Sequence, residues 1–388
     1  MVGPIRLDAN GPACRVTADV DGAPLWFETS DLEWTPAPEA LASALLIPAL
    51  HHRRRLRLSE PLDEVWSGNA VQLLAILRGW WGYPRWTPES PAFADAAAAD
   101  APGAGPDAGP SDHAPTALFF SGGVDSFHRL LRGSTRIDWL VTLRGFDFPL
   151  DDRVRAEAVE GAARTIAAAT GTRLVLVRTN VREHPLVRDT PWERTHGGVL
   201  AATAHLLGPA AARALISTST PGDLDIPYGS HWSIDPLWSS SRTTILHEGR
   251  GGRRIDRLRA IAAEPLVREH LRVCWQNRAP VGNCSRCAKC LLAMLILEEC
   301  GELAHSRAFV GRDELASRID ALSKTPDRYH SFEELGRSPN LNPALAASVK
   351  ALVRRSRYAV RGDVKLRRRV VGWLFEKLGI PPHRVAGR

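Results

Sequence analysis

One short stretch constrains the fold of this chain more than any other. The apolar residues 117–120 run directly into Ser121-Gly122-Gly123-Val124-Asp125-Ser126, and an amphipathic segment follows. This order predicts a buried strand, a tight turn and the start of a helix. The two glycines permit positive φ and let an anion approach the backbone, and the positive end of the helix dipole favours a phosphate there.

Each polar group of this turn has a predicted role. The backbone N–H groups of residues 122–124 can donate to an anion, and the hydroxyls of Ser121 and Ser126 are further donors. Asp125 either caps the helix or holds a metal ion. No Gly-Lys-Ser/Thr follows, so the stretch is not a Walker A loop. The competing interpretation is a Ser/Gly turn without a ligand. The order of strand, signature and helix favours a phosphate-binding loop.

Beyond this turn, short apolar runs alternate with amphipathic segments. Repeated β-α-β order of this kind predicts an α/β fold with a doubly wound parallel sheet, whose ligands bind beyond the carboxyl ends of the strands. Thr195 is a plausible N-cap of the last main helix, and Gly171 should end the one before it. The expected strands are 117–120, 139–143, 173–179, 214–218 and 243–247, and the expected helices are 125–132, 152–169 and 195–207.

Composition divides the chain into four segments. Residues 1–87 read as a small, separate α+β accessory domain that carries six of the twelve tryptophans. These tryptophans either fill its core or form a partner- or substrate-binding face. Residues 88–116 are rich in Ala, Pro, Gly and Asp and read as a disordered linker. Residues 117–300 form the predicted parallel-sheet domain, and residues 301–388 read as a helical, basic extension.

A cysteine cluster follows the predicted sheet. Cys274, Cys284, Cys287 and Cys290 have the spacing C-x9-C-x2-C-x2-C. The C-x2-C spacing lets two thiolates bind one ion while backbone N–H groups bond to their sulfurs, so the cluster predicts a structural Zn²⁺ site. An iron–sulfur cluster and four unligated buried cysteines are the alternatives. Cys14 and Cys300 stand alone and read as small core residues.

Charge and hydropathy bound the location and the partners. The 388-residue chain has a formal net charge of +7, and from Lys350 onward it carries twelve Lys or Arg residues against Asp363 and Glu376. This basic tail is either a solvated helix face or a binding surface for nucleic acid or an acidic protein. No secretory signal and no membrane-spanning run is evident, so we expect a cytoplasmic protein without a membrane partner.

The phosphate turn resembles the pyrophosphate loop (PP-loop) of the N-type ATP pyrophosphatases, which cleave ATP to AMP and pyrophosphate. Together with the cysteine spacing about 150 residues later, it resembles the 7-cyano-7-deazaguanine synthase (QueC) family. The resemblance implies the adenine nucleotide alpha-hydrolase variant of the Rossmann-like fold. It also implies adenylation of 7-carboxy-7-deazaguanine or a similar acid, with ATP and Mg²⁺, before an amide or nitrile forms. Residues 121–126 would hold the triphosphate, the backbone around Leu143 would meet adenine, and the four cysteines would bind zinc.

Three departures from that family concern the substrate. The family motif after the second strand is replaced by Arg144-Gly145-Phe146-Asp147. The family motif before the third helix is replaced by Arg194-Thr195-His196-Gly197-Gly198. Residues 1–87 and the basic tail are additional to the family. Arg144 is the first candidate, ahead of Lys289 and Arg254, to stabilise charge that builds on phosphate oxygens. His196 or His231 would take a proton from an attacking amine. Residues 227–235 form a polar, aromatic loop on the substrate side of the sheet.

Different functions remain open at this point. Relatives in bacterial anti-phage defence operons suggest an antiviral role, in which the enzyme joins a deazaguanine to a protein amine that binds through residues 1–87. An iron–sulfur-dependent tRNA thiolase would use the same loop to adenylate a base and the basic tail to hold RNA. A scaffold that only binds nucleotide or a partner is the third interpretation. The intact loop favours an ATP-dependent carbon–nitrogen ligase.

Overall fold

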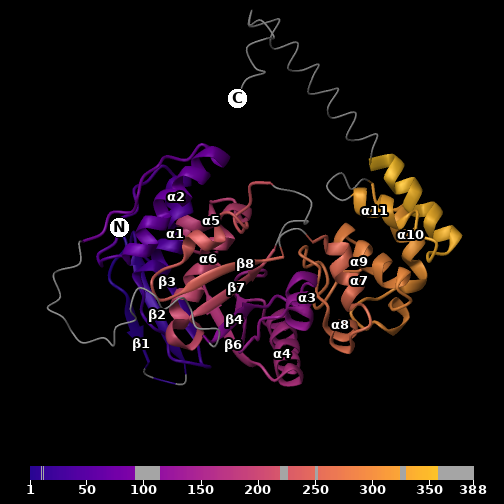
Figure 1. Cartoon of the computed structure of the whole chain (residues 1–388), viewed down its shortest axis with the longest axis horizontal. Coiled ribbons are helices and arrows are strands. Elements are labelled where there is room, and N and C mark those ends of the chain that lie inside the picture. Colours follow the sequence, from indigo (N-terminus) through magenta and orange to yellow (C-terminus); the bar gives the residue numbers. More distant parts are fainter. Residues whose placement is uncertain are drawn as a thin grey trace, which may run out of the picture. The chain divides into compact units, whose positions relative to one another are not determined.

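The computed structural model shows an α/β chain, and it describes residues 1–9, 11, 13–91, 114–218, 226–249, 252–323 and 329–356. Within these residues one eight-stranded sheet has the order β1-β2-β3-β6-β5-β4-β7-β8 (Figure 1). The chain forms two compact units. The first comprises Met1–Ile261 with His270–Gly282, and the second comprises Ala262–Glu269 with Asn283–Arg388.

Five neighbouring strands are parallel, which confirms the predicted α/β sheet. They are β4 (Thr116–Phe119), β5 (Trp139–Arg144), β6 (Arg173–Thr179), β7 (Arg213–Ser217) and β8 (Thr244–Glu248). The chain passes from β4 to β5 and β6 on one side, and then to β7 and β8 on the other. The direction of winding therefore reverses at β4, and the carboxyl end of this strand is where such sheets bind ligands.

The N-terminal strands extend this same sheet, so the prediction of a separate accessory domain over residues 1–87 is wrong. Strands β1 (Arg6–Asp8), β2 (Cys14–Val20) and β3 (Ala23–Thr29) form an antiparallel meander, and β3 pairs with β6. An Asp21-Gly22 turn joins β2 to β3, with both residues at positive φ. The pairing is reinforced because Glu28 accepts charged bonds from Arg15 at 2.6 Å and from Arg178 at 2.7 Å.

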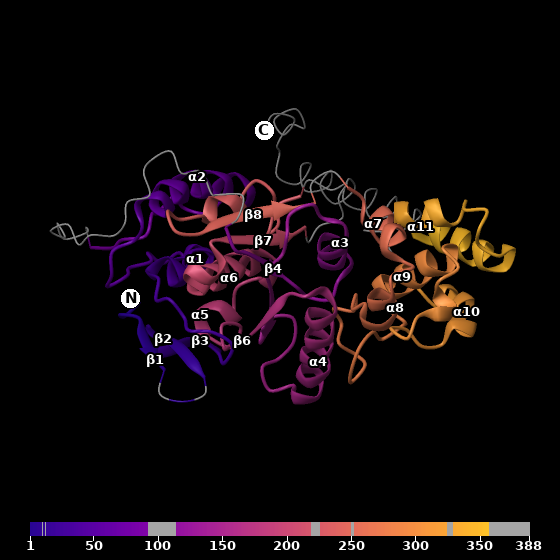
Figure 2. The ribbon, with the colours of Figure 1, turned by 60° about the horizontal axis from the view of Figure 1, so that its bottom comes forward.

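Two helices of this N-terminal region also pack onto the parallel sheet region. Helix α1 (Pro38–His51) contacts α6 (Trp192–Leu207), and α2 (Glu64–Trp81) reaches α1 through a 3.0 Å bond from Trp66 Nε1 to Ser43 Oγ. Helices α1 and α6 cover one face of the sheet, while α3 (Val124–Arg132) and α4 (Arg153–Thr170) cover the other (Figure 2). Most of the tryptophans of residues 1–87 are therefore part of, or packed against, one shared core.

Helix ends follow local chemistry, with one exception. Gly171 ends α4 in the left-handed region at φ 66°, as predicted. Helix α6 begins at Trp192 after Pro191, so the prediction that Thr195 is its N-cap is wrong. Proline fixes φ near the helical value and lacks an N–H, which suits the first positions of a helix. Thr195 lies inside the first turn and bonds its hydroxyl to Trp192 O at 3.3 Å.

The second unit is helical, and its boundary differs from the predicted one at residue 301. Helix α9 (Ala288–Glu299), which follows the cysteine cluster, packs against α10 (Leu315–Asp320) and α11 (Tyr329–Leu335). Its apolar side chains are buried against these helices, so it belongs to this unit. A further helix spans residues 343–356. The predictions for the linker and for the basic tail fall mainly on residues 92–113 and 357–388, which lie outside the described residues.

The remaining elements of the described residues are short helices and 3-10 turns. They are α5 (Pro185–Arg188), α7 (Arg254–Ile261), α8 (Pro265–His270), η1 (Gly208–Ala211), η2 (Asp235–Trp238), η3 (Leu303–His305) and η4 (Arg312–Glu314). Across the part of the chain that the structure describes, every helix is too short or too polar to cross a bilayer.

Close backbone contact at Gly198 generates a stability prediction. A Cβ at Gly198 would lie 2.4 Å from Ser43 O of α1, whereas a Cβ at Gly161 in α4 meets nothing within 4 Å. We expect Gly198→Ala to destabilise the chain by roughly 1–3 kcal/mol, because α1 must shift outward. Gly161→Ala should be neutral or stabilising by about 0.5–1 kcal/mol, because alanine restricts the unfolded chain. Urea titrations followed by tryptophan fluorescence measure both, and equal stability of the two variants would contradict the prediction.

Candidate functional site

The predicted phosphate turn lies at the carboxyl end of β4. Gly122 has φ 73°, and Gly123 precedes the first residue of α3. Within the turn, Gly123 N donates to Ser121 Oγ at 3.3 Å, and Ser126 Oγ donates to Gly123 O at 3.1 Å. Ser121 is exposed, and Val124 is buried beneath the turn. The strand, turn and helix expected from the sequence are therefore confirmed as geometry, with the N-terminal N–H groups of α3 at the sheet edge.

Asp125 is held by two arginines of α7. Arg254 donates to Oδ2 through Nε at 2.8 Å, and Arg257 Nη1 donates to Oδ1 at 2.5 Å. Arg257 also donates to the carbonyl oxygens of Gly249 and Gly252. The side chain of Arg254 is 25% exposed and that of Arg257 only 7% exposed. Asp125 thus anchors two guanidinium groups beside the turn, and Arg254 is the more accessible of the two.

Segment His270–Gly282 lies along the other side of the turn. Arg272 N donates to Gly122 O at 2.8 Å, and its guanidinium lies 3.5 Å from Asp147 Oδ2. A Cβ at Gly122 would lie 3.5 Å from Arg272 Cβ. The segment is also fastened to α4, because Arg155 donates to the carbonyl oxygens of Asn277 and Ala279 at 3.0 and 2.8 Å. No sequence signal placed this segment at the turn.

Leu143 and Arg144 end β5, next to β4. Phe120 N donates to Val141 O, and Thr142 Oγ1 donates to Phe120 O at 3.0 Å, so Leu143 lies beside the start of the turn. The Arg144 side chain instead bonds within the loop that joins β5 to α4. Its Nε donates to Leu150 O at 2.8 Å, and its Nη1 lies 3.9 Å from Glu160. The structure therefore brings Leu143 to the turn but gives Arg144 local structural partners.

His196 lies in an aromatic cluster formed by Phe146, Trp192, His196 and Tyr228. The rings of Phe146 and Trp192, and those of His196 and Tyr228, have centroids 4.9 Å apart. His196 Nδ1 donates to Trp192 O at 3.2 Å, which leaves the lone pair on Nε2. Among the described residues this buried Nε2 has no hydrogen-bond partner. Burial lowers the pKa of His196 below its ordinary value, so the ring is neutral at pH 7.

His231 lies in a different aromatic environment. Its ring packs against Trp80 of α2 at 5.0 Å and against Trp232 at 5.2 Å. Ser233 N donates to His231 Nδ1 at 3.2 Å, so in the neutral ring the proton sits on Nε2. Because Nε2 carries the proton, His231 is less suited to removing a proton than a histidine with its lone pair on Nε2.

A third histidine, which the sequence interpretation missed, forms a pair with a buried carboxylate. His247 Nδ1, at the end of β8, lies 2.7 Å from Asp235 Oδ2, and Ser230 Oγ donates to the same oxygen at 2.8 Å. Asp235 is fully buried. A carboxylate on Nδ1 fixes the tautomer and leaves the Nε2 lone pair available, as general bases require. The two residues lie on different elements, so no local sequence motif predicts that they pair.

The four predicted metal ligands lie together. All four sulfur atoms fall within 4.8 Å of one another, and the Sγ–Sγ distances are 3.8 Å for Cys284–Cys290 and 3.4 Å for Cys287–Cys290. Four thiolates around one Zn²⁺ at ~2.3 Å lie about 3.8 Å apart, so the spacing fits a single ion. A multi-iron cluster is wider and would spread its ligands further. Cys287 N also donates to Cys284 Sγ at 3.4 Å, as expected for a stabilised thiolate.

Comparison of the chain with protein-family models, with curated proteins and with solved structures gave no match. The interpretation of the site therefore depends on its geometry and on the sequence resemblance.

The cysteine geometry predicts a tightly bound metal. We expect the purified protein to contain about one zinc ion per chain, and Cys287→Ala to lose it, because three thiolates leave the ion open to water. Cys300→Ala is the matched control, since Cys300 ends the same helix outside the cluster. Atomic absorption measures the metal. A brown protein with stoichiometric iron, or zinc retained by Cys287→Ala, would contradict the prediction.

Proposed function

We propose that the chain is an ATP-dependent enzyme that adenylates a carboxylate, releases pyrophosphate and passes the acyl group to an amine. In the first step a carboxylate oxygen attacks the α-phosphorus of ATP, and the bond to the β-phosphate oxygen breaks. In the second step the amine displaces AMP and loses a proton as the amide forms. The observation that carries the proposal is the glycine turn at the switch point of the sheet, flanked by the Asp125–Arg254–Arg257 cluster.

The residues of the turn supply the groups that such a step requires. The N–H groups of Gly122 and Val124 and the exposed hydroxyl of Ser121 are donors for phosphate oxygens, while the Ser126 hydroxyl bonds to Gly123 O and supports the turn. Arg254 adds a cation that its bond to Asp125 pre-positions, so little reorganisation is required when charge develops. Leu143, at the neighbouring strand end, offers backbone groups to an adenine ring. Mg²⁺ would bind the phosphate oxygens and neutralise their charge, whereas both oxygens of Asp125 are already paired with Arg254 and Arg257.

The aromatic cluster supports a planar substrate. Half-buried Phe146, Trp192 and Tyr228 offer ring faces, and Arg182 stacks over Trp192 at 4.7 Å. The free lone pair of His196 Nε2 suits an N–H donor on a heteroaromatic ring. We therefore propose 7-carboxy-7-deazaguanine or a similar heteroaromatic acid as the substrate. The acceptor amine, which we propose can belong to a protein, would then lose its proton to His247.

The position of His247 is compatible with that role. Leu118 of β4 pairs with Leu215 of β7, and Ile216 of β7 pairs with His247 of β8. Neighbouring strands lie about 4.8 Å apart, so His247 is roughly 10 Å across the sheet from β4, near the same edge. An iron–sulfur-dependent tRNA thiolase is less well supported, because the sulfur spacing fits a single ion.

Arg254 provides the first functional test. With ATP, Mg²⁺ and 7-carboxy-7-deazaguanine, we expect AMP and pyrophosphate, and Arg254→Ala should lower kcat by about a hundredfold, because one charged donor to the transition state is lost. Arg259→Ala is the matched control, since Arg259 lies on the same helix and pairs with Asp256. Chromatography of the nucleotides and a pyrophosphate assay give the result. Formation of ADP alone would contradict the proposed adenylation, and equal rates for the two variants would contradict the role of Arg254.

His247 provides a second test that separates the two steps. We expect His247→Gln to lower amide formation by about a hundredfold while acid-dependent exchange of pyrophosphate into ATP persists, because only the second step consumes a base. His231→Gln should leave amide formation much less affected, since its Nε2 carries a proton. Loss of both reactions in His247→Gln would indicate a purely structural role for the histidine.

A further inference from the structure

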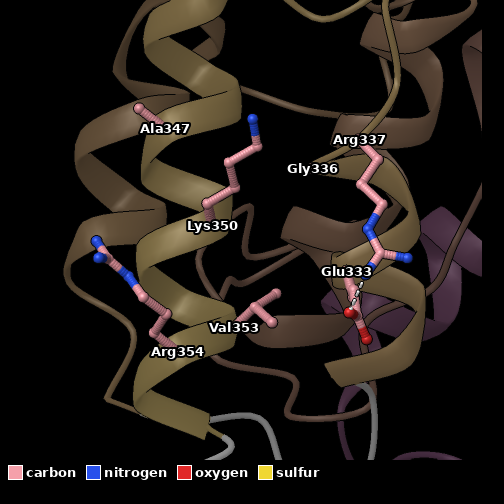
Figure 3. A pocket seen from close by; sticks show the side chains of 7 residues that line it. All are labelled: Glu333, Gly336, Arg337, Ala347, Lys350, Val353 and Arg354. Atoms are coloured by element: carbon pink, nitrogen blue, oxygen red, sulfur yellow. Dashed lines mark hydrogen bonds and ion pairs between the residues drawn. The ribbon is translucent and has the colours of Figure 1, made fainter.

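The second unit carries a groove that the proposed chemistry does not use. It has a volume of about 510 Å³ and lies between α11 and the helix of residues 343–356 (Figure 3). Both helices contribute side chains to it. The lining residues are Glu333, Gly336, Arg337, Ala347, Lys350, Val353 and Arg354.

The floor of this groove is apolar and firmly supported. Val353 is only 7% exposed, and Gly336 lets the two helices approach closely, because a Cβ there would lie 3.2 Å from Val349 Cγ1. Below the floor, Phe332 and Leu352 are fully buried. The groove therefore lies between two closely packed helices.

The rim of the groove is positively charged. Arg337 pairs with Glu333 at 2.5 Å, one helical turn away. Lys350 and Arg354 have no ion-pair partner among the described residues, and they lie four positions apart on one helix face. The lining thus has an excess of two positive charges. Two uncompensated cations above an apolar floor are complementary to a ligand that is apolar on one face and acidic along its edges.

We propose that this groove binds an acidic amphipathic segment of another protein, with an apolar side chain on Val353 and carboxylates on Lys350 and Arg354. The arrangement matches helix-in-groove recognition, in which an apolar face enters a groove and charges at the rim fix the orientation. A single-stranded nucleic acid fits less well. None of the seven lining residues is aromatic, so bases lack an aromatic stacking platform, and the apolar floor would face a polar sugar–phosphate backbone.

The test uses the full chain and a fluorescein-labelled peptide about five helical turns long, with leucines on one face and glutamates beside them. Fluorescence polarisation measures its affinity. Lys350→Glu combined with Arg354→Glu should weaken binding at least about tenfold, because attraction becomes repulsion. Arg307→Glu combined with Arg312→Glu is the charge-matched control, since these side chains are 81% and 51% exposed in the same unit outside the groove.

A second pair of variants tests whether the peptide occupies the groove itself. Ala347→Glu places a larger acidic side chain in the groove and should weaken binding about tenfold, whereas Ala344→Glu, exposed on the same helix outside the lining, should not. Circular dichroism confirms that all variants fold. Equal affinity of Ala347→Glu and Ala344→Glu, or an unlabelled RNA that displaces the peptide and itself depends on Lys350 and Arg354, would overturn the proposal.

Discussion

The buried carboxylate of Asp125 is the interaction on which the phosphate turn depends. A carboxylate with a side chain only 12% exposed is costly unless it is paired, and here two guanidinium groups occupy both of its oxygens. Because Arg257 also bonds to the carbonyl oxygens of Gly249 and Gly252, the same contact holds the connection between β8 and α7. The first turn of α3 is thus joined to the far edge of the sheet. Contacts of Asp125 with Arg254 and Arg257, and of Gly122 O with the backbone of Arg272, therefore hold the turn in its shape.

Sequence patterns predicted those features that short stretches of chain encode. The order of apolar run, double glycine and helix identified the turn, the strand lengths identified the sheet, and Gly171 marked a helix end, because each depends on neighbouring residues. The cysteine spacing likewise gave the metal ligands. The start of α6 was misplaced because a good capping residue, Thr195, stood three residues inside a helix that a proline had already begun.

Features that join distant elements were not predictable in this way. Nothing in the alternation of β3 indicates that its partner is β6, so the sequence predicts a separate domain where the structure has an antiparallel extension of the sheet. The pairing of His247 with Asp235 depends on where η2 lies against β8, and the contact of Arg272 with Gly122 depends on the path of His270–Gly282. His196 and His231 were singled out by residue type. The choice among the three histidines requires the tautomer of each ring, which its neighbours determine.

The glycine pair of α6 limits which parts of this chain can be removed. A Cβ at Gly197 would collide with Gly229 O, and one at Gly198 with Ser43 O, so a loop of the sheet and a helix of the N-terminal region press on consecutive positions. The N-terminal region is therefore built into the body of the chain. A shortened ancestor or engineered fragment starting at β4 would expose the edge of β6 and the inner surface of α6 to water, and it would aggregate. A side chain at position 198 would likewise force α1 away from α6 and loosen the N-terminal region from the sheet.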